Sequence, residues 1–148
     1  MSDRSTTPVT VPPVNDPQAI AACLAMRAIA VVGLSDQPTP TSNRVAAYMQ
    51  AQGYTIIPVN PQIREALGVR AYPSLTAVDQ PFALVNVFRR SEFVSGVVGE
   101  AIAAGAQGLW TQLGVIDYTA AERARAAGLF VVMDRCLMVE RAARGGAG

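Results

Sequence analysis

Short apolar segments alternate along the chain with longer segments in which apolar residues recur every three or four positions. The short segments are rich in Val, Ile and Leu and predict buried strands at residues 29–34, 54–60, 82–88, 108–114 and 129–134. The longer segments predict helices at residues 16–27, 42–52, 91–106, 117–128 and 135–146. Residues 61–75 predict a short helix, a glycine turn and a brief extended piece.

Capping residues mark several predicted helix ends. Asp16 followed by Pro17 is typical of a helix start, and Ser42 and Ser91 are candidate caps for the next two long helices. Gly53 is a suitable stop after the helix at 42–52.

The alternation of strands and helices predicts an α/β protein. We expect a three-layer, Rossmann-like fold with a five-stranded, mainly parallel, doubly wound sheet. Residues 1–15 are rich in Ser, Thr and Pro and predict a flexible arm, residues 16–144 the domain, and residues 145–148 a flexible tail.

Composition narrows the class of protein. The 148 residues are 51% hydrophobic and 16% charged, which suits one well-buried domain. A formal net charge of +1 argues against binding to nucleic acid or to a membrane surface. The apolar runs are too short to span a bilayer and the N-terminus lacks the apolar core of a secretory signal, so we expect a cytoplasmic protein.

The sequence contains no His and no Lys, and all 12 basic residues are Arg. This excludes Ser-His-Asp and Cys-His catalysis, phosphohistidine and Schiff-base chemistry, and a Walker-A lysine. Cys23 and Cys136 lack metal-ligand spacing and are expected to be reduced, packed thiols. We therefore predict no catalytic and no metal-binding residues, whereas Arg is well suited to holding phosphate.

Polar and basic residues follow the predicted strands. Ligands of doubly wound sheets bind beyond the carboxyl ends of the strands, where the strand order reverses. The residues predicted to line such a site follow the first four strands: Gly33, Leu34, Ser35, Ser42, Asn43 and Arg44; Pro58, Val59 and Asn60; Phe88, Arg89 and Arg90; and Thr111, Gln112 and Gly114. Their mixture of arginines, hydroxyls and amides favours an anionic ligand.

The loop after the first strand has two interpretations. Gly33 permits close approach of a ligand, and the free amides of the following helix attract phosphate. The alternative is an ordinary strand-to-helix turn with a capping serine and no ligand. The second and third glycines of the dinucleotide fingerprint are absent, and Asn60 stands where an acidic residue usually binds the ribose, which disfavours an ordinary NAD site.

Arg89 and Arg90 also have two interpretations. They are either a solvated pair, bridged to Glu92 or Asp117, or ligands of a bound anion. Two arginines at a helix N-terminus oppose the helix dipole, which favours the anion.

Several stretches occur in the same order and spacing in the small stand-alone CoA-binding domain proteins: IAVVGLSDQPTPTSNRVAAYM, GYTIIPVNP, YPSL, VNVFRR, LWTQLGV and AGLFVVMDRCLMVE. These proteins resemble the CoA-binding domain of the succinyl-CoA synthetase α subunit. The resemblance covers residues 17–141, nearly all of the predicted domain.

The resemblance implies a crevice that accepts coenzyme A. It implies that Gly33, Ser35 and Arg44 face the diphosphate, and that Pro58, Val59 and Asn60 line the nucleotide end. It further implies that Phe88, Arg89 and Arg90 supply a wall and charge, and that Thr111, Gln112 and Gly114 close the far side. The synthetase uses a phosphorylated histidine from a second domain and has further glycines in its loop, and this chain has none of these. Ligase activity is therefore not implied.

We expect a protein that binds CoA or an acyl-CoA without catalysing a reaction. Two alternatives remain: an enzyme or sensor for another nucleotide, such as NAD(H) or a nucleotide-sugar, and a protein-interaction module with an unidentified partner. Cys136 is expected to be a packed thiol, the alternative being a mixed disulfide with CoA. Asp134 is expected to cap the last helix, with Arg135 paired to it or to another carboxylate.

Overall fold

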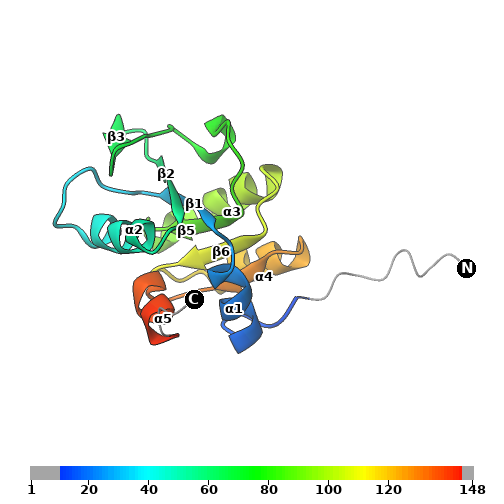
Figure 1. The fold of residues 1–148 in the computed structure, drawn as a ribbon. Coiled ribbons are helices and arrows are strands. Elements are labelled where there is room, and N and C mark those ends of the chain that lie inside the picture. The colour runs from blue at the N-terminus through cyan, green and yellow to red at the C-terminus, as the bar shows by residue number, and fades with distance from the viewer. Residues whose placement is uncertain (1–10, 145–148) are drawn as a thin grey trace, which may run out of the picture.

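The computed structural model describes residues 11–144. Five parallel strands form one sheet in the order β2-β1-β5-β6-β7 (Figure 1). The strands are β1 (Ala28–Val32), β2 (Thr55–Val59), β5 (Leu84–Val87), β6 (Gly108–Thr111) and β7 (Phe130–Val132). The helices are α1 (Pro17–Leu24), α2 (Thr41–Ala51), α3 (Val94–Ala103), α4 (Tyr118–Ala126) and α5 (Leu137–Ala143). The predicted α/β, Rossmann-like fold with a five-stranded parallel sheet is confirmed.

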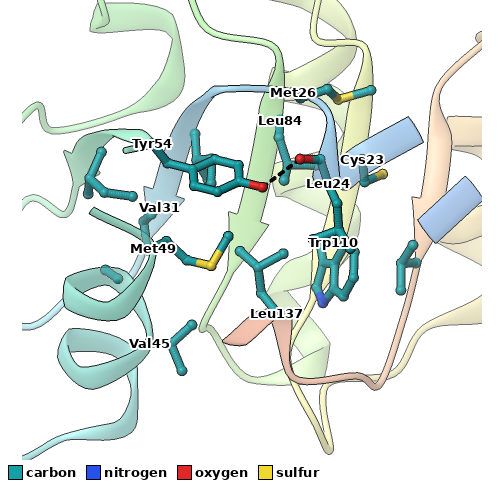
Figure 2. Packing of buried hydrophobic residues seen from close by; sticks show 14 of the residues in the cluster. Cys23, Leu24, Met26, Val31, Val45, Met49, Tyr54, Leu84, Trp110 and Leu137 are labelled. Atoms are coloured by element: carbon teal, nitrogen blue, oxygen red, sulfur yellow. Dashed lines mark hydrogen bonds between the residues drawn. The ribbon is translucent and has the colours of Figure 1, made fainter. Parts of the chain in front are cut away.

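The side chains of the strands alternate between two apolar cores, one on each face of the sheet. Ile29 and Val31 of β1 pack with α1, α2 and α5, and Figure 2 shows part of this cluster around Trp110. Ala30 and Val32 pack with α3 and α4 on the other face. Both faces are buried, which is why the strands are mostly apolar, with Asn86 of β5 and Thr111 of β6 as buried polar exceptions.

Residues 61–75 contain the predicted glycine turn and extended piece but not the predicted short helix. No helix forms there; β3 (Glu65–Ala66) and β4 (Val69–Arg70) make a small hairpin, followed by a 3₁₀ turn at Leu75–Ala77. Leu67 and Gly68 both have positive φ, 54° and 76°, as the two-residue turn of such a hairpin requires. The chain then runs beside β2, where the Tyr72 N–H donates to the Pro58 carbonyl at 2.9 Å.

The predicted caps have mixed outcomes. Asp16 caps α1, because its Oδ1 accepts from the Gln18 N–H at 2.8 Å. Pro40 stands at the capping position of α2, and Cys136 stands at the capping position of α5. The prediction that Ser42 and Asp134 cap these helices is therefore wrong. Ser91 begins a 3₁₀ turn, and its hydroxyl accepts from the Ile116 N–H at 2.8 Å instead of capping α3. Ser91 and Asp134 bind the loop after β6 in place of their own helices, and Ser42 binds Ser35 in the loop that leads into α2.

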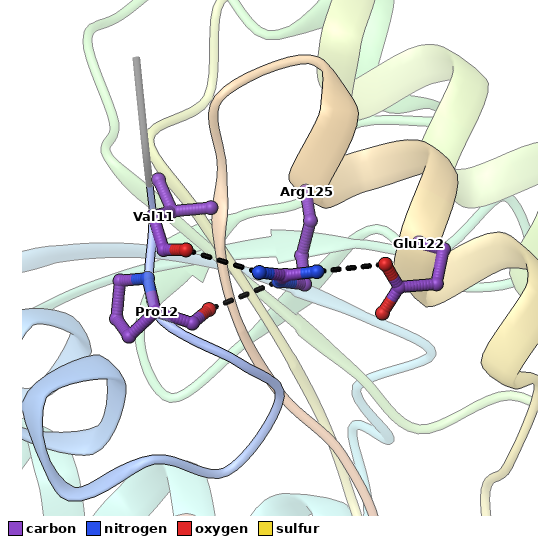
Figure 3. Close-up of polar contacts among 4 residues, drawn as sticks. All are labelled: Val11, Pro12, Glu122 and Arg125. Atoms are coloured by element: carbon purple, nitrogen blue, oxygen red, sulfur yellow. Dashed lines mark hydrogen bonds and ion pairs between the residues drawn. The ribbon is translucent and has the colours of Figure 1, made fainter. Parts of the chain in front are cut away.

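The predicted arm at residues 1–15 includes five residues that the structure describes, from Val11 onward. The Arg125 guanidinium donates to the carbonyls of Val11 and Pro12 at 3.0 and 2.9 Å, and Glu122 pairs with it at 2.7 Å (Figure 3). Asn15 exchanges hydrogen bonds with the backbone of Met133. These contacts hold residues 11–15 against α4 and β7.

Candidate functional site

A cavity of about 340 Å³ lies at the carboxyl edge of the sheet, where β1, β2 and β5 end. It is walled by the turns after these strands, by residues 73–75 and by α3: Val32, Gly33, Val59, Asn60, Pro61, Gln62, Pro73, Ser74, Leu75, Phe88, Arg89, Val97 and Glu100. Five of the predicted site residues are among them, namely Gly33, Val59, Asn60, Phe88 and Arg89.

The register of the sheet explains why these turns meet. Val32 of β1 is aligned with Val59 of β2 on one side and with Val87 of β5 on the other. The chain leaves β1 for β2 and later returns to the opposite side of β1 as β5, so the strand order reverses at β1. The residues after these strands therefore emerge side by side at the reversal, where ligands bind in such sheets.

Gly33 is held in a crowded turn. Its φ is +89°, its N–H donates to the Val59 carbonyl at 2.8 Å, and a Cβ there would lie 2.8 Å from the Phe88 carbonyl oxygen. Only glycine accommodates both the conformation and the close approach. The close packing of the strand ends thus explains why glycine is required at position 33. The same packing places Gly33 in the cavity wall.

The loop from Leu34 to Asn43 is fixed by its own polar side chains. The Ser35 N–H donates to Ser42 Oγ at 3.0 Å, and Asn43 Nδ2 donates to the Ser35 carbonyl at 2.8 Å. Asn60 Nδ2 donates to the Leu34 carbonyl at 3.0 Å, and Leu34 itself is buried in the core. Ser42 and Asn43 are buried as well. Several groups predicted to bind phosphate are therefore engaged in shaping the loop.

The three arginines expected at the site are arranged differently. Arg89 lines the cavity and lies over the Phe93 ring at 4.2 Å. Arg90 is 77% exposed and lies 3.8 Å from Glu92, while Asp117 caps α4 by accepting from Ala120. Arg44 is exposed on α2 and is not part of the cavity wall. The structure brings Arg89 alone of the three to the cavity.

The far-side residues form a separate polar network. Thr111 Oγ1 donates to the Val115 carbonyl at 2.7 Å and accepts from the Asp134 N–H at 3.0 Å. Asp134 Oδ1 accepts from the Gly114 N–H at 2.7 Å. Gln112 is buried, with its Oε1 unpaired among the described residues. This network joins the loops after β6 and β7, and Arg135 donates to the Asp134 backbone carbonyl.

Pro58, which was predicted to line the nucleotide end of the site, is buried within β2.

Sequence reasoning missed Glu100 and residues 73–75. Glu100 Oε1 accepts from the Leu75 N–H at 3.1 Å, which attaches the segment to α3. The other carboxylate oxygen has no partner among the described residues and belongs to a side chain of the cavity wall. Glu100 follows Val97 by three residues, so the two side chains lie on the same face of the helix after β5. This spacing is the sequence signal that would have placed Glu100 beside the cavity.

Other chemistry is limited in residues 11–144. No three His, Cys, Asp or Glu side chains there are grouped so that they could hold a metal ion. None of the helices in that range has the length and apolar character needed to cross a membrane. Both cysteines are free and buried, and burial raises the pKa of the Cys23 thiol to about 12.

Comparisons with known proteins find a matching family and solved structures of the same fold. The family described as CoA binding domain matches residues 27–142. The uncharacterized protein YneT of Bacillus subtilis is 49% identical over 114 residues, which cover 77% of this chain and 84% of YneT. A hypothetical protein from Pyrococcus horikoshii is 32% identical with a TM-score of 0.82, covering 89% of this chain and 96% of that one.

A larger enzyme shares the fold. The dinucleotide-forming acetyl-coenzyme A synthetase 1 of Ca. Korarchaeum cryptofilum has a TM-score of 0.61 and 23% identity. The match covers 71% of this chain and 25% of the synthetase.

Proposed function

This chain belongs to the CoA-binding domain family, and we propose that it binds coenzyme A or an acyl-CoA at the carboxyl edge of its sheet without catalysing a reaction. The observation that carries the proposal is the cavity bounded by Gly33, Asn60 and Arg89 at the reversal of strand order.

The cavity volume limits what part of the ligand can enter. At about 340 Å³ the cavity is near the lower end of small-molecule sites, which run from roughly 300 to 1,000 Å³. CoA is larger than a typical drug-sized ligand. The nucleotide end is therefore proposed to enter, while the pantetheine arm lies along the rim over the turns after β5 and β6.

Two ionisable side chains of the wall are given complementary roles. Arg89 would pair with the diphosphate, because a guanidinium makes charge-assisted hydrogen bonds to phosphate oxygens. Glu100 would accept a hydrogen bond from a ribose hydroxyl or the adenine amino group, since one of its oxygens is free of protein partners. The apolar surfaces of Val59, Leu75 and Val97 would pack against the base.

Glu100 also favours a second candidate. NAD(H) is usually held in such folds by a carboxylate on the ribose, and the residue after β2 is Asn60. Glu100 offers such a carboxylate from α3 instead. Another nucleotide therefore remains the alternative ligand, and the calorimetry below decides between the two.

Isothermal titration calorimetry with CoA, acetyl-CoA, dephospho-CoA, ATP and NAD tests the proposal. We expect CoA or acetyl-CoA to bind more tightly than NAD and ATP, and acetyl-CoA to remain intact during incubation. Preferential binding of NAD would favour the alternative, and absence of heat with millimolar CoA would refute the proposal.

Two neighbouring arginines provide a matched pair of variants. Arg89→Gln and Arg90→Gln remove the same charge one residue apart, but only Arg89 lines the cavity. We expect Arg89→Gln to weaken CoA binding about tenfold or more, as loss of a charge-assisted hydrogen bond does. Arg90→Gln should change the affinity by less than about threefold. Equal losses would mean that Arg89 acts only through long-range charge and would contradict its assigned role.

A further inference from the structure

A second hollow lies at the opposite, amino-terminal edge of the sheet. Its volume is about 260 Å³, and its wall includes Arg27, Tyr54, Arg141 and Arg144 together with the end of α1. Arg27 directly precedes β1 and Tyr54 directly precedes β2, whereas the first cavity lies beyond the other ends of these strands. A five-residue strand spans roughly 16 Å, so the two hollows are separate.

Arg141 is the central feature of this hollow. The residue is only 7% exposed, yet its guanidinium has no hydrogen-bond or ion-pair partner among residues 11–144. The unpaired nitrogens of its side chain remain in contact with solvent. Because the residue forms part of the wall of the hollow, these nitrogens open onto it. A buried guanidinium without a counter-charge is unfavourable, and most such groups in proteins are paired.

The carbonyl groups at the end of α1 already have donors of their own. The Ala25 N–H donates to the carbonyls of Ala21 and Ala22 at 3.1 and 3.2 Å. The Tyr54 hydroxyl donates to the Leu24 carbonyl at 2.6 Å, as the dashed line in Figure 2 shows. The helix end therefore does not depend on Arg141 to satisfy these oxygens, and the guanidinium donors remain available.

Two further arginines add positive charge to the same wall. Arg27 lies over the Tyr54 ring at 4.0 Å and donates one hydrogen bond, to the Gln52 carbonyl at 3.2 Å. Arg144 pairs with Glu140 at 3.0 Å. The wall thus contains three guanidinium groups, and one carboxylate, that of Glu140, is paired with them through Arg144. Their excess of two positive charges outweighs the partial negative charges, about half an elementary charge each, at the ends of α1 and α5.

We propose that this hollow binds an oxyanion of the phosphate type, with Arg141 as the buried ligand and Arg27 and Arg144 at the rim. The tetrahedral oxygens of such an anion match the fork of N–H donors that each guanidinium presents. The site is distinct from the proposed CoA cavity, because no residue belongs to both walls. Phosphate binding here can therefore be tested independently of CoA binding.

Amide NMR of the ¹⁵N-labelled protein titrated with inorganic phosphate at constant ionic strength tests this site. We expect saturable shifts of Ala25, Arg27, Tyr54 and Arg144 in the wild-type protein, and phosphate should raise its melting temperature. Arg141→Gln should weaken phosphate binding about tenfold or more. The matched control is Arg123→Gln, which removes an arginine of α4 that binds Ser95, and it should leave the shifts unchanged.

Arg144→Gln keeps the test decisive if Arg141→Gln does not fold, because Arg144 is on the surface and its loss should also weaken phosphate binding, by about threefold or more. The proposal is overturned by shifts that do not saturate, by shifts confined to Gly33 and Asn60, or by equal binding in the Arg141 or Arg144 variant. Acetate binding as tightly as phosphate would also overturn the assignment, since it would point to a carboxylate group as the natural occupant.

Discussion

Replacing Gly33 by Ala should destabilise the fold by two separable effects. The alanine would have to adopt a φ of +89°, which costs about 1–2 kcal/mol for an L-residue. It would also lie 2.8 Å from the Phe88 carbonyl oxygen and 3.2 Å from Arg89 Cδ. Because the nearest atom belongs to the backbone of a neighbouring turn, relief requires the strand ends to separate, at an overpacking cost of about 1–3 kcal/mol. The total expected loss of unfolding free energy is about 2–5 kcal/mol.

Gly105→Ala is the matched control for this substitution. Gly105 has a similar φ of +79°, but a Cβ there would meet no atom within 4 Å. Urea unfolding of both variants then measures the conformational cost in Gly105→Ala and the sum in Gly33→Ala. With a denaturant slope of about 1–3 kcal/mol/M, a loss of about 3 kcal/mol lowers the Gly33→Ala midpoint by roughly 1–3 M. Losses equal within about 0.5 kcal/mol would show that the close approach to Phe88 carries no energetic weight, and would refute the reasoning.

Three further substitutions test other parts of the structure. Tyr54→Phe should cost about 1–2 kcal/mol in urea unfolding, because it leaves the buried Leu24 carbonyl without its donor, and calorimetry should find CoA affinity unchanged. The Cys23 thiol, whose pKa burial raises from 9.0 to about 12, should resist alkylation at pH 8. Since the unfolded thiol ionises first, the stability advantage of wild type over Cys23→Ala should shrink as pH rises from 9 toward 12, and a constant difference in pH-dependent unfolding would contradict this. Arg125→Gln should speed proteolysis and hydrogen exchange at residues 11–15, because it removes two hydrogen bonds to the backbone there; unchanged rates would show that Arg125 does not hold this segment.

The sheet was predictable because each strand is buried on both faces. Segments such as residues 29–34 are continuous apolar runs, and their alternation with helical periodicity leaves few topologies. The absence of the helix predicted within residues 61–75 has a local cause. Leu67 adopts φ +54°, a conformation rare for a branched residue, and the segment pairs with the edge of β2. Ile63 and Leu67 stand four residues apart, which favours a helix when the neighbouring strand is unknown.

The cavity was predictable at the level of loops and for only some of its side chains, such as Asn60 and Arg89. The register of parallel strands dictates that the residues after β1, β2 and β5 meet. It does not reveal which face of the sheet the cavity occupies. Val32, Val59 and Val97 belong to the core beneath α3, so the cavity opens on that face. The predicted ligands at the start of α2, from Ser42 to Arg44, belong to the helix layer on the opposite face.

Hydrogen-bonding capacity that is unused and also lies on a cavity wall separates site from scaffold along this chain. Ser42, Asn43 and Thr111 were plausible ligands by residue type, but each is buried and engaged in bonds that fix a loop. Arg89 and Glu100 line a cavity and keep donors or an acceptor free, and Arg141 does so at the other edge. The two classes should respond differently to substitution. Removing a scaffold group leaves a buried partner unsatisfied, so stability should fall by about 1–3 kcal/mol. Removing Arg89 or Arg141 breaks no hydrogen bond among the described residues, so the loss should appear chiefly in ligand affinity, whereas removing Glu100 should also free the Leu75 N–H and lower stability.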